Sequence, residues 1–183
     1  MPTHIALLRA VNVGGTGKLA MTDFRALLAG LGYTGIETYI QSGNAVFNAR
    51  GTSASVAKAV AAALARHMGA PVDVIVRDHA GLARVIAQNP FAAEAAADGA
   101  RVHVGFLAGK VKTGAAAELE RIVAAYPVRC DSFHLADDAL YLHLPDGAAD
   151  TKFTPRAVER ALGVASTGRN WNTVLKLHTM SQR

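Results

Sequence analysis

Apolar residues recur along the first half of the chain in two patterns, one typical of strands and one typical of helices. Short apolar runs indicate strands, and apolar side chains at three- and four-residue spacing indicate helices. Between two of the strands, Ser42-Gly43-Asn44 has the glycine and asparagine that accept the positive φ of a tight hairpin. The predicted order is strand 4–11, helix 22–31, strands 36–41 and 45–48, helix 53–68 and strand 72–77.

The helices also carry recognisable ends. Thr22 is predicted to cap the start of the first helix and Gly32 to end it, because a hydroxyl accepts from free N–H groups and glycine takes a left-handed conformation. The second helix has an apolar stripe and is stopped by Gly69 and Pro71. The stripe consists of Val56, Val60, Leu64 and Met68.

The same order of elements recurs in the second half, after a linking helix over 79–88 and a loop around Asn89-Pro90-Phe91. The predicted elements there are strand 101–108, helix 114–126, strands 128–135 and 139–144, a helix from Thr154-Pro155 to Gly163, and a last helix over 171–180. The last helix is expected to bury Trp171, Val174, Leu175 and Leu177.

Both halves fit one fold class. The sequence predicts an α+β protein of two tandem ferredoxin-like (split β-α-β) units plus a C-terminal helix. The expected boundaries are 1–78 for the first unit, 79–100 for the linking helix and loop, and 101–183 for the second unit with the C-terminal helix.

Composition narrows the class of protein. The chain has 183 residues, of which 51% are hydrophobic, enough for one good core or two small ones. Its apolar runs fall short of the roughly 20 residues that a membrane span needs, and the N-terminus lacks a signal-peptide pattern, so we expect a cytoplasmic protein without a membrane partner. Cys130 is the only cysteine, which excludes an internal disulfide, and we expect a buried strand thiol.

The formal net charge is +5, which favours acidic partners such as phosphates, nucleotides and nucleic acid. The basic residues are spread along the chain without a run of like charges, so a merely solvated basic surface remains an alternative. An RRM-type RNA-binding sheet is not expected, because neither 103–108 nor 45–50 supplies the aromatic RNP pattern.

Two polar loops, each directly after a predicted strand, are the strongest candidates for a site. In a split β-α-β unit the first two strands are parallel with the third between them, so residues 12–18 and the hairpin 41–44 should meet at one sheet edge. Glycine amides there could cradle an anion, with nearby basic side chains adding charge. The candidate ligand-binding residues are Arg9, Asn12, Gly14, Gly15, Lys18, Gln41, Ser42 and Asn44.

A third polar segment precedes the last helix. Asn170 is predicted to cap that helix, whose N-terminal N–H groups could hold an anion with Arg169 alongside. If the segment folds back to the loop after the first strand, Arg169 and Asn170 join the same site. Capping and packing alone, with Trp171 as a core anchor, is the alternative.

Known reaction motifs are absent. Residues 12–19 fail the phosphate-binding P-loop, since Asn12 and Leu19 stand where that motif needs glycine and a hydroxyl residue, and the dinucleotide fingerprint fails as well. The seven histidines show no metal-ligand spacing, and Ser42 has no base assigned to it. No cofactor and no metal are predicted, and whether the protein is an enzyme stays open.

Several strings of residues are distinctive: 5–15, Met21, 38–44 with Phe47, 89–91, and 169–174 with Lys176-Leu177. These strings resemble those of the domain-of-unknown-function 1697 family across nearly the whole chain. The resemblance implies an α+β protein whose signature residues gather in these loops, and it implies no established activity. Where the family usually has Arg-Gly-Ile-Asn, this chain has Arg9-Ala10-Val11-Asn12, and its stretch Thr16-Gly17-Lys18-Leu19 is less basic.

The leading hypothesis is a small anionic, phosphate-bearing ligand held between the loop 12–18 and the hairpin 41–44. A nucleic-acid-binding module that uses the diffuse positive charge is the second hypothesis, and the two would differ in the salt dependence of their affinity. The third is a structural or interaction protein whose polar loops only shape the backbone. The oligomeric state is not indicated by the sequence.

Overall fold

A computed structural model describes residues 1–13 and 17–182. The chain divides into two compact units: Met1–Arg84 with the segment from Lys176 onward, and Val85–Leu175. Each unit is described by itself. The described residues form a mixed α+β protein with two four-stranded antiparallel sheets and seven α-helices.

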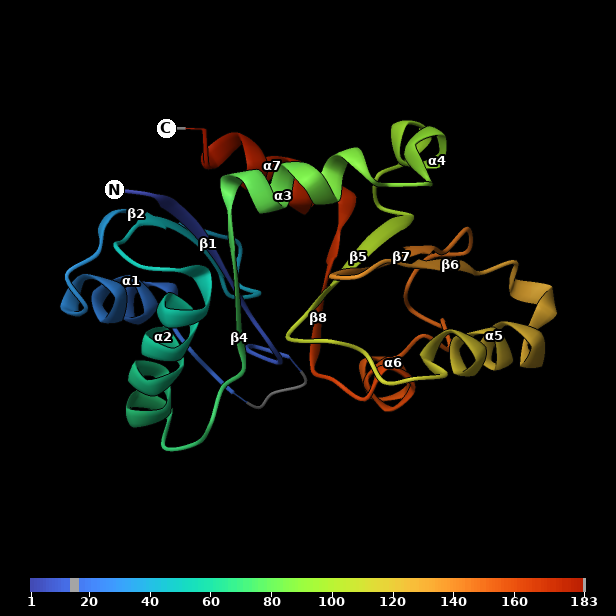
Figure 1. The fold of residues 1–183 in the computed structure, drawn as a ribbon, viewed down its shortest axis with the longest axis horizontal. Coiled ribbons are helices and arrows are strands. Elements are labelled where there is room, and N and C mark those ends of the chain that lie inside the picture. The colour runs from blue at the N-terminus through green and yellow to red at the C-terminus, as the bar shows by residue number, and fades with distance from the viewer. Residues whose placement is uncertain (14–16, 183) are drawn as a thin grey trace. The chain divides into compact units, whose positions relative to one another are not determined.

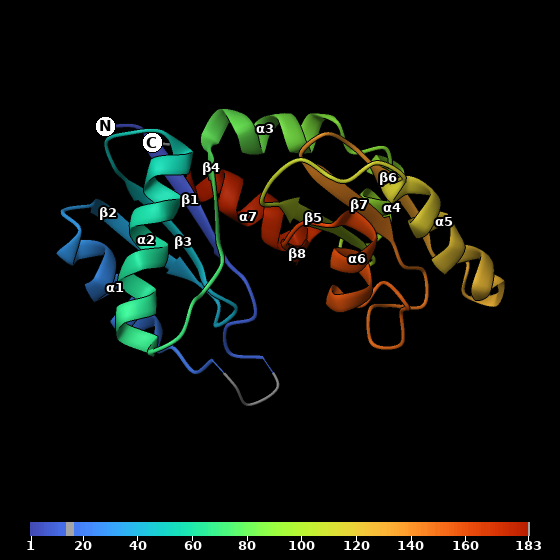
Figure 2. The ribbon, with the colours of Figure 1, turned by 60° about the horizontal axis from the view of Figure 1, so that its bottom comes forward.

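The first unit is built on a sheet with the strand order β2-β3-β1-β4, in which all neighbouring strands are antiparallel. Two helices lie side by side on one face of this sheet (Figures 1 and 2). The elements are β1 (Thr3–Leu8), α1 (Met21–Gly30), β2 (Thr34–Tyr39), β3 (Asn44–Asn48), α2 (Ser53–Met68) and β4 (Val74–Asp78).

The core of the first unit lies between the sheet and the two helices. Phe24 and Leu28 of α1 are fully buried, as is Leu64 of α2. They pack with Leu8 of β1 and Phe47 of β3 in one cluster, and the ring of Tyr33 stacks on Phe47 with 5.0 Å between centroids. The helical stripe predicted for residues 53–68 therefore faces this core.

The second unit repeats the arrangement with the strand order β6-β7-β5-β8. Leu119 of α5, Leu140 of β7 and Leu162 of α6 are fully buried in its cluster. Its elements are β5 (Val102–Leu107), α5 (Ala115–Ala125), a 3-10 turn (Pro127–Arg129), β6 (Ser132–Leu135), β7 (Ala139–His143), α6 (Pro155–Leu162) and β8 (Ser166–Asn170).

Three helices complete the chain. They are α3 (His79–Ala87), α4 (Ala92–Ala97) and α7 (Trp171–Met180), and the division between the two units falls within α3 and within α7. Asn170 caps α7, because its side-chain oxygen accepts from the N–H of Thr173 at 2.9 Å, as predicted. Trp171, Val174 and Leu177 are buried as expected, whereas Leu175 is 41% exposed.

Several sequence-based boundaries were wrong for identifiable reasons. The first strand ends at Leu8 and not at residue 11, because Ala10 and Asn12 have positive φ angles of 54° and 57°. The first helix begins at Met21 after Ala20, so Thr22 lies within the first turn and is not the cap.

In the second unit the structure contains a strand, β8, that was not predicted from the sequence. This polar strand pairs along its length with β5 and buries Ser166, Thr167 and Arg169. Cys130 is exposed, with a positive φ of 54°, and is not the buried strand thiol that was expected. The 3-10 turn before Cys130 is also why β6 starts at Ser132 and not at residue 128.

Within the described residues, no helix combines the length and the apolar character that crossing a membrane would require.

Buried imidazoles should make this fold sensitive to acid. Burial lowers the pKa of His4, which is 2% exposed, although the Asp78 carboxylate acts in the opposite direction. Burial likewise lowers the pKa of His103. Unfolding restores the ordinary pKa of about 6.5, so below that pH the unfolded chain binds more protons than the folded protein and stability falls.

We therefore expect the free energy of unfolding in urea to be level above pH 7 and to fall between pH 6.5 and pH 5. A His4→Leu variant should lose less stability over the same interval, because one of the responsible groups is gone. An equal loss in the variant would show that His4 does not contribute.

Candidate functional site

The segment that leaves β1 is closed by local hydrogen bonds. The N–H of Asn12 donates to the carbonyl of Gly17 at 3.1 Å. Gly17 has φ +62°, and a Cβ there would lie 2.9 Å from the carbonyl oxygen of Ala10, so the position requires glycine. Gly14 and Gly15, predicted as anion-binding amides, lie outside the described residues.

The side chain of Asn12 joins this loop to the β2–β3 hairpin. Its amide nitrogen donates to the carbonyls of Leu19 (2.9 Å) and Gln41 (2.8 Å), while its oxygen accepts from the N–H of Leu19 (2.9 Å). The predicted meeting of the two loops is confirmed, since β3 lies between β1 and β2 and the loops leave the same edge of the sheet.

An asparagine side chain also stabilises the hairpin through hydrogen bonds. Asn44 is fully buried, and its amide nitrogen donates to the carbonyl of Tyr39 and to Oγ of Ser42, both at 3.0 Å. Between them, the backbone carbonyl of Gly43 accepts a hydrogen bond from the N–H of Leu8 at 2.8 Å. The side chains of Asn12, Ser42 and Asn44 therefore form hydrogen bonds within and between the loop and the hairpin.

Backbone strain is concentrated at this edge. Among the described residues, the non-glycine positions with positive φ are Ala10, Asn12, Ile40 and Cys130, and the first three belong to the loop and the hairpin. A positive φ is most unfavourable for a β-branched residue such as Ile40, whose φ is 50° and whose side chain is half exposed. Strain of this kind is commonly found at functional sites.

A pocket of about 430 Å³ opens beside the loop. Its walls are the end of β1 with the following loop, and the connection from α2 to β4. Arg9, Lys18 and His67 bring basic groups to it, whereas Gln41, Ser42 and Asn44 do not line it. The other lining residues are Ala10, Val11, Gly17, Met68, Ala70, Pro71, Val72 and Asp73.

Arg9 is fixed in this pocket by its neighbour across the sheet. Its N–H donates to the carbonyl of Asp73 at 3.0 Å, and its guanidinium meets the Asp73 carboxylate at 3.4 Å. Both side chains keep substantial exposure, 34% and 54%, so the pair contributes little stability. Lys18 is exposed and makes no ion pair with any residue that the structure describes.

The electrostatic balance of the pocket is moderately positive. Arg9 and Lys18 outweigh Asp73 by one formal charge. The C-terminal end of α2, at Met68, contributes partial negative charge from its last carbonyls, and Arg66 in the last turn counters it. An anion would be attracted here by side chains and not by a helix N-terminus.

Arg169 and Asn170 belong to the second unit. The guanidinium of Arg169 donates to Oγ1 of Thr167 and to the carbonyl of Gly168, both at 2.8 Å. Burial lowers the pKa of Arg169 to about 10, which leaves it protonated at neutral pH. The Asn170 oxygen is engaged as the cap of α7.

The second wall of the pocket, formed by the α2–β4 connection, was not predicted from the sequence. The order β3-β1-β4 pairs Leu8 at the end of β1 with Val74 at the start of β4, so the α2–β4 connection must run beside the loop that leaves β1. That topology was implied by the predicted elements. His67 and Asp73, from either end of the connection, could have been named on that ground.

Among the described residues, no three His, Cys, Asp or Glu side chains gather closely enough to hold a metal ion.

Comparison with known proteins places the chain in a family. The family model described as "Protein of unknown function (DUF1697)" matches residues 1–141. The chain belongs to this DUF1697 family. A comparison with curated proteins finds no match.

A solved structure shares the fold of this DUF1697 protein. It is described as the structure of conserved bacterial protein SP0830 from Streptococcus pneumoniae. The TM-score is 0.72 and the sequence identity is 19%, with 99% of each chain covered. At this identity the likeness concerns the fold alone.

The amide of Asn12 can be tested by an isosteric change. In Asn12→Asp the acceptor for the Leu19 N–H is kept, but both donations to carbonyls are lost, so we expect a loss of about 1–2 kcal/mol in the free energy of unfolding at pH 7. The control is Asn48→Asp, because the Asn48 oxygen only accepts, from Thr3 Oγ1 at 3.2 Å. Equal stability of the two variants would contradict the role given to Asn12.

Gly43 provides a second test. It has φ +77°, and a Cβ there would lie 2.7 Å from Cβ of Leu8, whereas Gly69, with φ +69°, has open space around it. Gly69→Ala should lower the free energy of unfolding by about 1 kcal/mol, because alanine is strained at a positive φ. Gly43→Ala should lower the free energy of unfolding by a further ~1–3 kcal/mol, because Leu8 must move. If urea denaturation shows similar losses of stability in Gly43→Ala and Gly69→Ala, the hairpin can move away from Leu8 at little cost, and the prediction is wrong.

Proposed function

We propose that this protein binds a small anionic, phosphate-bearing ligand in the pocket between the loop after β1 and the α2–β4 connection. The observation that carries the proposal is that Arg9 and Lys18, both candidate anion ligands on sequence grounds alone, line one pocket together with His67. Arg9 would offer a planar fork and Lys18 a mobile point charge to a phosphate.

The arrangement of the loop supports this assignment. The Asn12 side chain bonds the backbone of Leu19, next to Lys18, and the carbonyl of Gln41, so the backbone that precedes α1 is held in place beside the pocket. Preorganised ligands lose less entropy on binding. In this proposal Asn12, Ser42 and Asn44 shape the site, and Gly14 and Gly15 remain predicted amide donors.

We further propose that each unit is a ferredoxin-like split β-α-β unit. The element order β-α-β-β-α-β, with the third strand between the first two, supports this in both halves. Residues 79–100 would then link the two units.

A polynucleotide is the competing partner, favoured by the net charge of +5. Its binding would involve many phosphates and would therefore weaken steeply with salt, whereas one phosphate group in a pocket gives a shallow dependence. Isothermal titration with pyrophosphate and with a short single-stranded oligonucleotide, each at 50 and 200 mM salt, separates the two partners.

Lys18→Gln tests the proposed function. Loss of one charged hydrogen bond should weaken pyrophosphate binding about tenfold. The control is Lys58→Gln, an exposed lysine on α2 that lines no described pocket and should leave the affinity unchanged. Equal effects of the two substitutions would point to diffuse charge, and absence of pyrophosphate binding to the unmodified protein would refute the proposal.

A further inference from the structure

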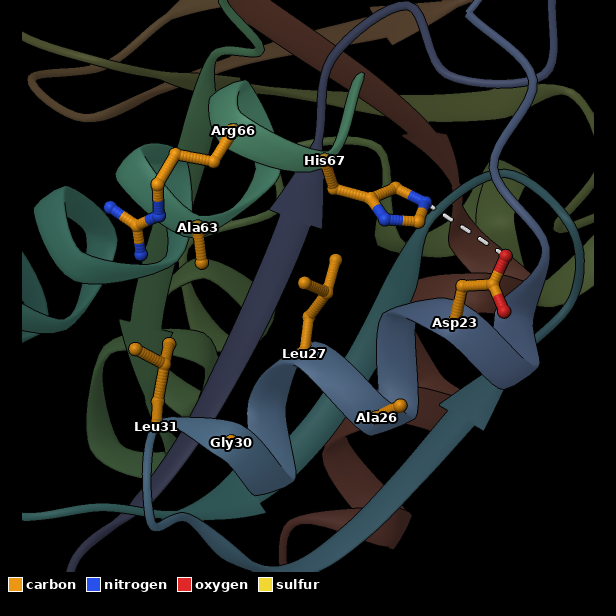
Figure 3. A pocket seen from close by; sticks show the side chains of 8 residues that line it. All are labelled: Asp23, Ala26, Leu27, Gly30, Leu31, Ala63, Arg66 and His67. Atoms are coloured by element: carbon orange, nitrogen blue, oxygen red, sulfur yellow. Dashed lines mark ion pairs between the residues drawn. The ribbon is translucent and has the colours of Figure 1, made fainter. Parts of the chain in front are cut away.

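A second cavity in the first unit lies between α1 and α2 (Figure 3). It has a volume of about 540 Å³, within the range of small-molecule sites. Leu27 of α1 and Leu31, which directly follows α1, form its apolar wall with Ala63 of α2 opposite. Both leucines are only partly buried, although they pack against the core.

The cavity is open because two of the α1 residues that line it have small side chains or none. Ala26 and Gly30 line it, and a Cβ built at Gly30 would meet no atom within 4 Å. Solvent therefore reaches apolar surface on Leu27 and Leu31, and covering that surface would be favourable.

Charged groups occur only at the rim. Asp23 of α1 and His67 of α2 approach to 3.8 Å, and the side chain of Arg66 lies at another part of the rim (Figure 3). An apolar interior with a few polar groups at its edge is typical of a site for the apolar part of a small ligand.

His67 connects the two cavities of this unit. It lines the groove between α1 and α2, and it also lines the basic pocket that contains Arg9 and Lys18. The two cavities therefore share His67 in their walls, with cationic groups in one cavity and an apolar wall in the other. A ligand with an anionic end and an apolar end would complement the basic pocket and the apolar groove at the same time.

We propose that the ligand is an amphipathic phosphate monoester. Its phosphate lies with Arg9 and Lys18, and its alkyl or aryl group passes His67 and covers Leu27 and Leu31. This inference rests on the proposed function, since it takes the basic pocket as the phosphate site. It adds the chemical class of the remainder of the ligand.

Methyl, butyl and octyl phosphate, titrated calorimetrically below micellar concentrations, test the chain-length requirement. Complete burial of a methylene gives roughly a fourfold gain in affinity, and an open groove should give about half of that, near twofold for each added methylene. We expect affinity to rise from methyl to octyl phosphate accordingly. Methyl phosphate that binds as tightly as octyl phosphate would overturn the inference and leave the proposed function standing.

A pair of variants on one helix turn identifies the groove. Gly30→Leu places a side chain in the open space and should reduce the affinity for octyl phosphate to that for methyl phosphate. The control is Ala29→Leu, an exposed position outside the groove that should preserve the chain-length effect. A chain-length effect that survives in Gly30→Leu would mean that the alkyl group binds elsewhere, which overturns the inference.

Lys18→Gln and neutral octyl glucoside separate this inference from the proposed function. Lys18→Gln should weaken all three phosphates by the same factor, and octyl glucoside should bind far more weakly than octyl phosphate. Binding of octyl glucoside and octyl phosphate with equal affinity, unaffected by Lys18→Gln, would overturn both. Failure of all three phosphates to bind would also overturn both.

Discussion

The polar edge of the first sheet depends on one asparagine, whose side chain forms hydrogen bonds with backbone groups of two loops. Where β1 ends, the chain must turn away while the neighbouring β2–β3 hairpin closes beside it, and both segments leave polar backbone groups without strand partners. Asn12 bonds the N–H and carbonyl of Leu19 and the carbonyl of Gln41. Its left-handed conformation, which asparagine tolerates better than most residues, lets one side chain reach all three. These bonds hold the backbone of Leu19, next to Lys18, against Asn12.

That constraint separates the polar residues of the edge into two groups. Asn44 and Ser42 satisfy the inside of the hairpin, and the carbonyl of Gln41 receives the Asn12 amide. The basic groups of Arg9 and Lys18 line the pocket shared with the α2–β4 connection. The amide side chains thus stabilise the backbone, whereas Arg9, which pairs with Asp73, and Lys18 bring positive charge to the pocket. His67 lines both that pocket and the apolar groove between α1 and α2, which is the basis for proposing an amphipathic ligand.

The sequence predicted what periodicity and turn chemistry control. The stripe of α2, the glycine at the hairpin and the cap at Asn170 follow from local rules, and the structure contains all three. β8 could not be predicted in the same way, because its sequence Ser-Thr-Gly-Arg-Asn is polar and becomes a strand only by pairing with β5. The pocket wall formed by His67 and Asp73 required tertiary reasoning, since these residues meet Arg9 only through the β1–β4 pairing.

The central claim is that an anion binds on the α2–β4 side of the loop and not over the hairpin. Backbone amide chemical shifts of the isotopically labelled protein, followed by NMR during titration with pyrophosphate, test it most directly. We predict saturable shifts at Arg9, Val11, Lys18 and residues 67–70 and 72–73, with smaller changes at Ser42 and Asn44. Shifts centred on the hairpin, or scattered over basic positions of both units without saturation, would contradict it.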